Sequence, residues 1–147
     1  MLDNGVAAAC AEHNIPLVAY SPVCRGLLTG KFKSIEDIPE GSRLRMFPRF
    51  QPDAFPINLE LVKRVEALAK KKGCTSAQLA INWTIALSKK PGMPTIIPIP
   101  GATATARIDE NGKQLEITDA EMAEIDSTLK KFEVVGARYP PFIPTEG

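Results

Sequence analysis

The sequence contains few of the residues that build metal centres or disulfide frameworks. His13 is the only histidine, so a site with several histidine ligands is excluded. The three cysteines, Cys10, Cys24 and Cys74, are odd in number and have no CxxC spacing. This usage is typical of free thiols in a reducing compartment, so we expect a cytoplasmic protein without a metal site.

Long apolar runs and an excess of charge are also missing. No stretch approaches the roughly twenty apolar residues of a membrane-spanning helix, and residues 1–5 lack the features of a signal peptide. The formal net charge of the 147 residues is +1, which provides no general attraction to nucleic acid or to an acidic membrane. We therefore expect neither as a partner. A hydrophobic content of 44% and a charged content of 24% are ordinary for a globular domain.

Several segments have helical signals. An alanine-rich helix is predicted over residues 6–12, and an apolar stripe predicts a second helix that ends at Gly73. The capping box at residues 75–78 opens a third helix, which is apolar nearly all round and should be covered on more than one side. A further helix is predicted over residues 105–111, and a second capping box opens one at residue 118.

Two short apolar segments predict buried strands. Residues 17–20 lie between Pro16 and Pro22, and a second strand begins at Thr95. We expect Pro98 and Pro100 to make a long ladder beyond Ile97 unlikely. Strands that alternate with helices predict parallel pairing in an α/β fold.

Two stretches show no sustained periodicity. Residues 29–56 contain four prolines and three arginines, and a loop of this length is usually a functional lid or disordered. Residues 134–147 form an irregular, proline-rich tail. We therefore divide the chain into a main unit, residues 1–133, and this tail.

Each predicted strand runs into a loop rich in glycine and small hydroxyl residues. The first such segment covers residues 18–31 and the second covers residues 99–111. Loops of this composition let a backbone approach a phosphate group closely. The two segments together therefore predict the two halves of a dinucleotide site.

These segments resemble the C-terminal part of aldo-keto reductases, and the similarity extends over nearly the whole chain. Residues 19–31 resemble the seventh strand of the family's barrel with its loop. Residues 75–83 resemble the helix before the eighth strand, and residues 97–111 resemble that strand and the cofactor loop. The resemblance implies the C-terminal portion of a (β/α)8 TIM barrel, with about two of its strands, and hence an incomplete barrel.

The family binds NADPH in an extended conformation and reduces aldehydes or ketones by hydride transfer. By this resemblance, Tyr20 would lie against the nicotinamide ring, and the loop after it would wrap the pyrophosphate, with residues 29–56 acting as a clasp. Gly101 and Thr103 would lie at the adenosine phosphate, and Arg107 would contact the 2′-phosphate or stack on adenine. The implied cofactor-binding residues are Tyr20, Ser21, Pro22, Val23, Cys24, Gly26, Lys31, Arg45, Gly101, Thr103, Arg107, Glu110 and Asn111.

The pyridoxal reductase-like group is the most similar part of the family, partly because of the Arg138–Pro140 tail. The tail residues Arg138, Tyr139 and Phe142 would help to line a pocket for a small carbonyl substrate. Two positions depart from the pattern. Ala104 stands where many NADPH-preferring members carry Lys or Arg, and Val23 replaces the more usual Leu.

The catalytic Asp-Tyr-Lys-His set of the family has no counterpart in the sequence. Those residues belong to the first half of the barrel, whose strands would precede Met1, so we expect a C-terminal fragment. His13 has the surroundings of a solvated surface residue, and Tyr139 has no lysine beside it. We assign no catalytic residue and expect the chain alone to lack reductase activity.

Two other interpretations stay open. The chain could be a non-enzymatic module that binds nucleotide or a partner subunit, as the potassium-channel beta subunits of this family do, or that self-associates through exposed strand edges. It could also be an unrelated α/β piece whose glycine loops bind simple phosphate. Taken alone, Arg107 and Glu110 could form no more than a surface ion pair.

Overall fold

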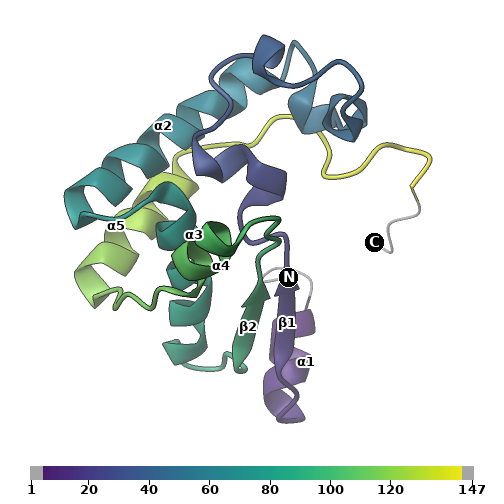
Figure 1. Ribbon diagram of the computed structural model, residues 1–147. Coiled ribbons are helices and arrows are strands. Elements are labelled where there is room, and N and C mark those ends of the chain that lie inside the picture. The colour runs from purple at the N-terminus through teal and green to yellow at the C-terminus, as the bar shows by residue number, and fades with distance from the viewer. Residues whose placement is uncertain (1–4, 144–147) are drawn as a thin grey trace.

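The computed structural model describes residues 5–143 and consists of a two-stranded parallel sheet with helices packed against it (Figure 1). Helix α1 lies beside β1, while α2, α3 and α5 lie on the opposite flank of the sheet (Figure 1). Short 3-10 turns (η) connect the larger elements. The elements with helical or extended geometry are α1 (Val6–Glu12), β1 (Leu17–Tyr20), α2 (Phe55–Lys72), α3 (Ser76–Ala86), β2 (Ile96–Ile99), α4 (Thr105–Gly112) and α5 (Asp119–Lys130).

The two strands pair in parallel, with Leu17 opposite Ile96 and Tyr20 opposite Ile99. One face of this sheet is buried against the helices through Leu17, Ala19 and Ile96. The other face is open, because successive side chains of a strand point to opposite sides. Its side chains are Val18, Tyr20, Ile97 and Ile99, which are 46% to 57% exposed.

The second strand is short, as its two prolines predicted, and it ends before Pro100. The strand runs through Pro98 to Ile99, and Pro98 pairs with Ala19. The backbone N–H of Leu17 donates to the carbonyl of Thr95, so Thr95, Ile97 and Ile99 direct their backbone groups toward β1. The nitrogen of Pro98 therefore points away from β1, and its missing N–H costs the ladder no hydrogen bond.

The helical predictions are confirmed at their boundaries. Gly73 adopts φ +76° and ends α2, with its N–H directed to the carbonyls of Ala69 and Lys70. Thr75 and Gln78 form the reciprocal capping box of α3. Nearly every α3 residue is buried, as its uniformly apolar character predicted. The main core gathers side chains from α3, α2, α5 and the inner face of the sheet.

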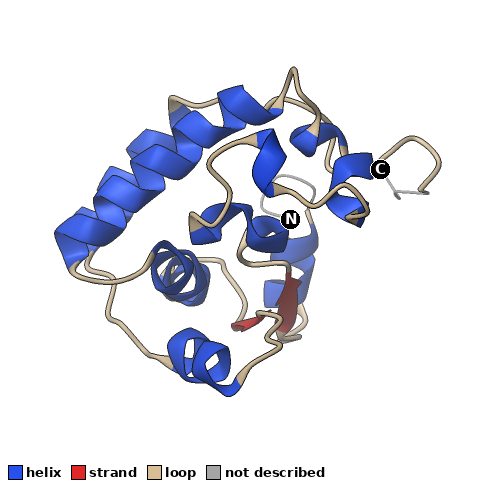
Figure 2. Cartoon of the chain, turned by 45° about the horizontal axis from the view of Figure 1, so that its top comes forward, coloured by secondary structure: helices blue, strands red, loops and turns tan. Residues whose placement is uncertain are grey.

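Residues 29–56 are folded back on themselves rather than open. The segment contains three 3-10 turns, Ile35–Asp37, Arg43–Met46 and Pro48–Phe50, and its last residues already belong to α2. Its apolar side chains build a second core against α2, in which Ile38 and Phe55 are fully buried. Figure 2 shows these turns packed at one end of the long helix α2. The arginines of this segment are therefore attached to a packed loop and not to an open lid.

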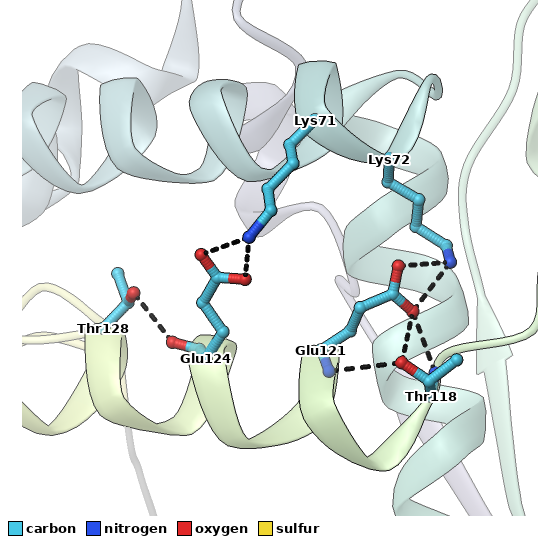
Figure 3. A network of polar contacts seen from close by, with 6 residues as sticks. All are labelled: Lys71, Lys72, Thr118, Glu121, Glu124 and Thr128. Carbon is cyan, nitrogen blue, oxygen red and sulfur yellow. Dashed lines mark hydrogen bonds and ion pairs between the residues drawn. The ribbon is translucent and has the colours of Figure 1, made fainter.

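Helix α5 is fastened to the end of α2 by charged groups (Figure 3). Lys72 Nζ lies 2.8 Å from each carboxylate oxygen of Glu121, and Lys71 Nζ lies 2.7 Å from Oε2 of Glu124. Glu121 also closes the capping box of α5 by accepting from the backbone N–H of Thr118. The hydrogen bond from Lys72, followed by that from the Thr118 backbone, lowers the pKa of the Glu121 carboxyl.

Glu121→Gln is expected to lower the free energy of unfolding at pH 7 by about 0.5–1 kcal/mol, because the neutral amide can keep the capping box but loses the ion pair with Lys72. Because folding depresses the pKa of this carboxyl, its stabilisation is present above the unfolded pKa and is lost as pH falls through the folded pKa. Urea unfolding at neutral and acid pH measures this pH dependence. The free energy of unfolding of the variant should fall less between neutral and acid pH than that of the unmodified chain. Glu124→Gln, which breaks a more exposed pair, is the control and should change less. Equal acid profiles for Glu121→Gln and the unmodified chain would contradict the assignment.

Among residues 5–143, no helix is long and apolar enough to cross a membrane. The same described residues contain no group of three or more side chains suited to holding a metal ion.

Candidate cofactor-binding site at the carboxyl ends of the strands

The two glycine-containing segments meet at one edge of the sheet. Because β1 and β2 are parallel and in register, the loop that follows Tyr20 and the loop that follows Ile99 leave the sheet at the same end. Ligands of α/β folds bind at this carboxyl end of the strands. The two segments are far apart along the sequence, and the parallel pairing brings them together.

The loop after β1 has an unusual backbone. Ser21, Cys24 and Arg25 adopt φ values of +55°, +50° and +56°, in the left-handed region that non-glycine residues seldom occupy. Gly26 follows at φ +89°, and its carbonyl accepts a hydrogen bond of 2.6 Å from the Thr29 hydroxyl. A run of such residues in a short loop is typical of ligand-contact segments.

Tyr20 ends β1 and is half exposed on the open face of the sheet. Its hydroxyl lies 2.5 Å from the hydroxyl of Tyr139 in the tail, and the Arg138 guanidinium lies 4.5 Å from the centre of its ring. Arg138 thus contacts the ring of the residue expected to face the nicotinamide. The hydrogen bond between the hydroxyls raises the pKa of Tyr20, with burial acting in the same direction, and lowers the pKa of Tyr139.

The tyrosine pair can be followed by phenol absorbance, because Tyr20 and Tyr139 are the only tyrosines in the chain. We expect two separated ionisation steps, one on each side of the ordinary pKa of 10.0, which belong to the pair as a whole. In Tyr139→Phe the pKa of the remaining Tyr20 should fall toward 10.0. In Tyr20→Phe the pKa of the remaining Tyr139 should rise toward 10.0, because each variant loses the shared hydrogen bond. Superimposable titrations of the two variants and the parent would refute the contact.

The tail is held in place by Asn58, a residue that the sequence did not single out. The Asn58 side chain, on α2, is 2% exposed; its Nδ2 donates to the carbonyls of Arg49 and Val135, and its Oδ1 accepts from the Val135 N–H at 3.0 Å. Gly136 follows at φ +87°, and a Cβ there would lie 2.8 Å from the backbone of Pro48. An amide inside the apolar stripe of a helix is the only sequence signal of this anchor.

The basic residues predicted on the clasp differ in their surroundings. The Arg45 guanidinium donates to loop carbonyls, at 2.6 Å from Nη2 to Ile38 O and 3.2 Å from Nη2 to Ile35 O. It therefore braces the loop. Lys31 is exposed, with its ammonium 5.7 Å from the centre of the Phe32 ring.

The loop after β2 is open to solvent. Gly101, Thr103 and the other residues from 101 to 106 are exposed, and the N-cap Ala104 offers no side-chain hydrogen bond to the first turn of α4. The backbone N–H groups at the start of a helix favour an anion. These features leave the beginning of α4 accessible at the same edge as the loop after β1.

On α4, Arg107 and Glu110 form the surface ion pair that their spacing allows as an alternative to cofactor contacts, with Nη1 and Oε2 2.5 Å apart. Gln78 Nε2 donates to the Glu110 carbonyl at 3.3 Å and ties α4 to α3. Asn111 is half buried beside them. Arg107 stays exposed, so the pair leaves its guanidinium accessible to a ligand.

The remaining residues of the first loop are partly covered. Pro22 and Val23 are half buried, and so is Cys24, where burial raises the pKa of the thiol. A raised pKa keeps the thiol protonated at neutral pH, which is typical of a packing residue. His13 is exposed on the turn after α1, as the sequence predicted.

Parallel strands joined through helices, with glycine-containing loops at their carboxyl ends, place the chain in the α/β class. The model of the aldo/keto reductase family matches residues 2–130, and the chain belongs to that family. The resemblance seen in the sequence is thereby confirmed.

Curated relatives agree with this assignment. The chain is 41% identical over 139 residues to "Aldo-keto reductase yakc [NADP(+)]" of Schizosaccharomyces pombe, a match that covers 93% of this chain and 39% of the relative. It is 37% identical to "Probable pyridoxal reductase 2" of the same yeast, over 92% of this chain and 41% of the relative. The chain thus spans about two-fifths of the length of these relatives.

A solved structure supports the fold. A thermostable aldo-keto reductase, crystallised with the inhibitor epalrestat, superposes with a TM-score of 0.54 at 24% identity, over 85% of this chain and 34% of the other. The arrangement of strands and helices therefore fits part of a TIM barrel, as the sequence predicted.

Proposed function

We propose that this chain provides the NADP(H)-binding part of an aldo-keto reductase that transfers hydride to an aldehyde or ketone. The observation that carries the proposal is the meeting of the loops after β1 and β2 at one edge of the sheet. The name of the yeast relative, which includes NADP(+), supports the choice of cofactor. Pyridoxal is the candidate substrate suggested by the name of the second relative.

Different residues of the chain would bind different parts of the cofactor. The Tyr20 ring would orient the nicotinamide, and the left-handed backbone around Cys24 and Gly26 would follow the pyrophosphate. The start of α4, with Gly101 and Thr103 before it, would face the adenosine phosphate. Arg107 would hold the 2′-phosphate. When bound, the cofactor supplies the hydride, and the chain positions it.

Binding of the cofactor is tested by titrating the chain with NADPH and NADH and following nucleotide fluorescence. Because Arg107 is the cation assigned to the 2′-phosphate, Arg107→Ala should weaken NADPH binding about tenfold and leave NADH binding nearly unchanged. Arg43→Ala, at an exposed arginine of the clasp, is the matched control and should alter neither. An unchanged ratio of the two affinities in Arg107→Ala would remove Arg107 from the site.

We further propose that the chain alone performs no reduction, because none of its residues takes the part of the family's Asp-Tyr-Lys-His set. The purified chain with NADPH and an aldehyde should show no loss of absorbance at the nicotinamide band. Steady turnover that scales with protein concentration would refute this.

A second function, as a subunit-interaction module, is favoured by the open face of the sheet. Four side chains expose apolar surface on this face, Val18, Tyr20, Ile97 and Ile99, and the outer edges of β1 and β2 pair with no other strand among residues 5–143. This combination promotes association. Light scattering coupled to gel filtration should then find a dimer or larger species, and Ile97→Glu should shift it to monomer. Ile57→Glu, at an exposed isoleucine of α2, is the control. A monomer at all concentrations would exclude self-association.

A further inference from the structure

A large apolar cavity lies next to the proposed cofactor site. Its volume is about 590 Å³, within the range of small-molecule pockets, and its walls come from β1, the loop after it, α2, α3 and α5. Trp83, the only tryptophan of the chain, lines it, and the buried indole N–H of Trp83 has no hydrogen-bond partner among the described residues. Most of the wall is aliphatic, including Leu61, Val65, Leu79 and Leu129.

The charged side chains that line this cavity are all arginines. Arg25 comes from the loop after β1, Arg49 from the turn before α2, and Arg138 from the tail. In the part of the chain that the structure describes, none of the three forms an ion pair with a carboxylate. Three uncompensated cations beside an apolar wall create a strong preference for an anion.

Aromatic rings and the tail hold these arginines together. The guanidinium of Arg25 lies 4.1 Å from the ring centre of Phe47 and 5.0 Å from that of Tyr139. The Arg138 guanidinium lies 5.8 Å from the same Tyr139 ring, and Arg49 Nε donates to the Gly136 carbonyl. The charges of all three arginines also lower the pKa of the Cys24 thiol, against the larger effect of burial. The three guanidinium groups therefore act electrostatically on the same place.

We propose that the arginine cluster and the cavity together bind an amphipathic anion, a carboxylate carried on an apolar chain of medium length. The carboxylate would lie among Arg25, Arg49 and Arg138, where guanidinium groups offer paired donors. The apolar chain would extend along the aliphatic wall toward Trp83. The site borders the proposed cofactor site, because Arg25 lies in the loop proposed to follow the pyrophosphate. It goes beyond the proposed cofactor function through Arg49, Arg138 and Trp83, to which no cofactor contact is assigned.

The test uses decanoate as the probe, decanol as its neutral match, and acetate as the carboxylate without an apolar chain. Trp83 fluorescence reports occupancy, and calorimetry gives the affinity. We expect decanoate to bind at least tenfold more tightly than either comparison compound. Raising the salt concentration should weaken decanoate binding and leave decanol binding nearly unchanged, because screening acts on the charge pair alone.

Arg138→Gln should weaken decanoate binding about tenfold without affecting decanol, since Arg138 contacts its neighbours through the faces of aromatic rings. Arg43→Gln is the matched control. Arg107→Ala should leave decanoate binding intact, which separates this site from the proposed cofactor function. Decanol binding as tightly as decanoate, acetate binding as tightly as decanoate, or an unchanged Trp83 signal would each overturn the proposal.

Discussion

Phe55→Ala is expected to lower the free energy of unfolding by about 3–5 kcal/mol, the largest loss that we expect from a single substitution in this chain. Phe55 is 0% exposed at the start of α2, and its ring stacks on Phe50 with centroids 5.9 Å apart. Truncation would remove buried apolar surface and leave a hole in the second core, because the surrounding side chains relax only partly into such a space.

Urea unfolding followed by circular dichroism measures this loss. Phe142→Ala, at a phenylalanine that is 67% exposed, is the matched control and should change stability by less than about 0.5 kcal/mol. Because the second core carries the clasp, Phe55→Ala should also make residues 29–54 more accessible to protease. A loss below about 1 kcal/mol would show that this core contributes little.

Asn58→Ala should cost about 2–4 kcal/mol, because it removes one side chain that satisfies three backbone groups. The Arg49 carbonyl and both polar backbone groups of Val135 would lose their partner in a place that excludes water. The variant should also release the tail, so the separated ionisation steps of Tyr20 and Tyr139 should merge near 10.0.

Chemical unfolding and the tyrosine titration together check this result. Gln114→Ala removes an exposed amide and is the control, with an expected change of less than about 0.5 kcal/mol. If Asn58→Ala left both the stability and the titration unchanged, the tail would not depend on this anchor.

Most of the secondary structure could be predicted because its signals are local. The capping boxes at Thr75 and Thr118 and the left-handed glycine at residue 73 mark helix ends through contacts within a few residues. The inclusion of Pro98 within β2 has no such local signal. Whether a missing N–H matters depends on which side the neighbouring strand lies, and this is a property of the pairing.

The candidate site also combines features that the sequence predicts with features that it does not. The glycine and hydroxyl loops and the charge of Arg107 are properties of the sequence, and so is the resemblance to the aldo/keto reductase family, which the family model confirms. The engagement of Arg45 with loop carbonyls could not be predicted, because its partners at residues 35 and 38 depend on how the clasp folds.

Residue type and short-range spacing were enough to predict the helices and the two loops suited to phosphate, and the resemblance of these segments indicated the family that the family model confirms. Two features emerged only from the folded chain: Asn58 anchors the tail, and Arg138 and Tyr139 contact Tyr20. Each of these contacts joins residues more than seventy positions apart. No local pattern encodes such a contact, because it forms only when the strands pair and the cores close.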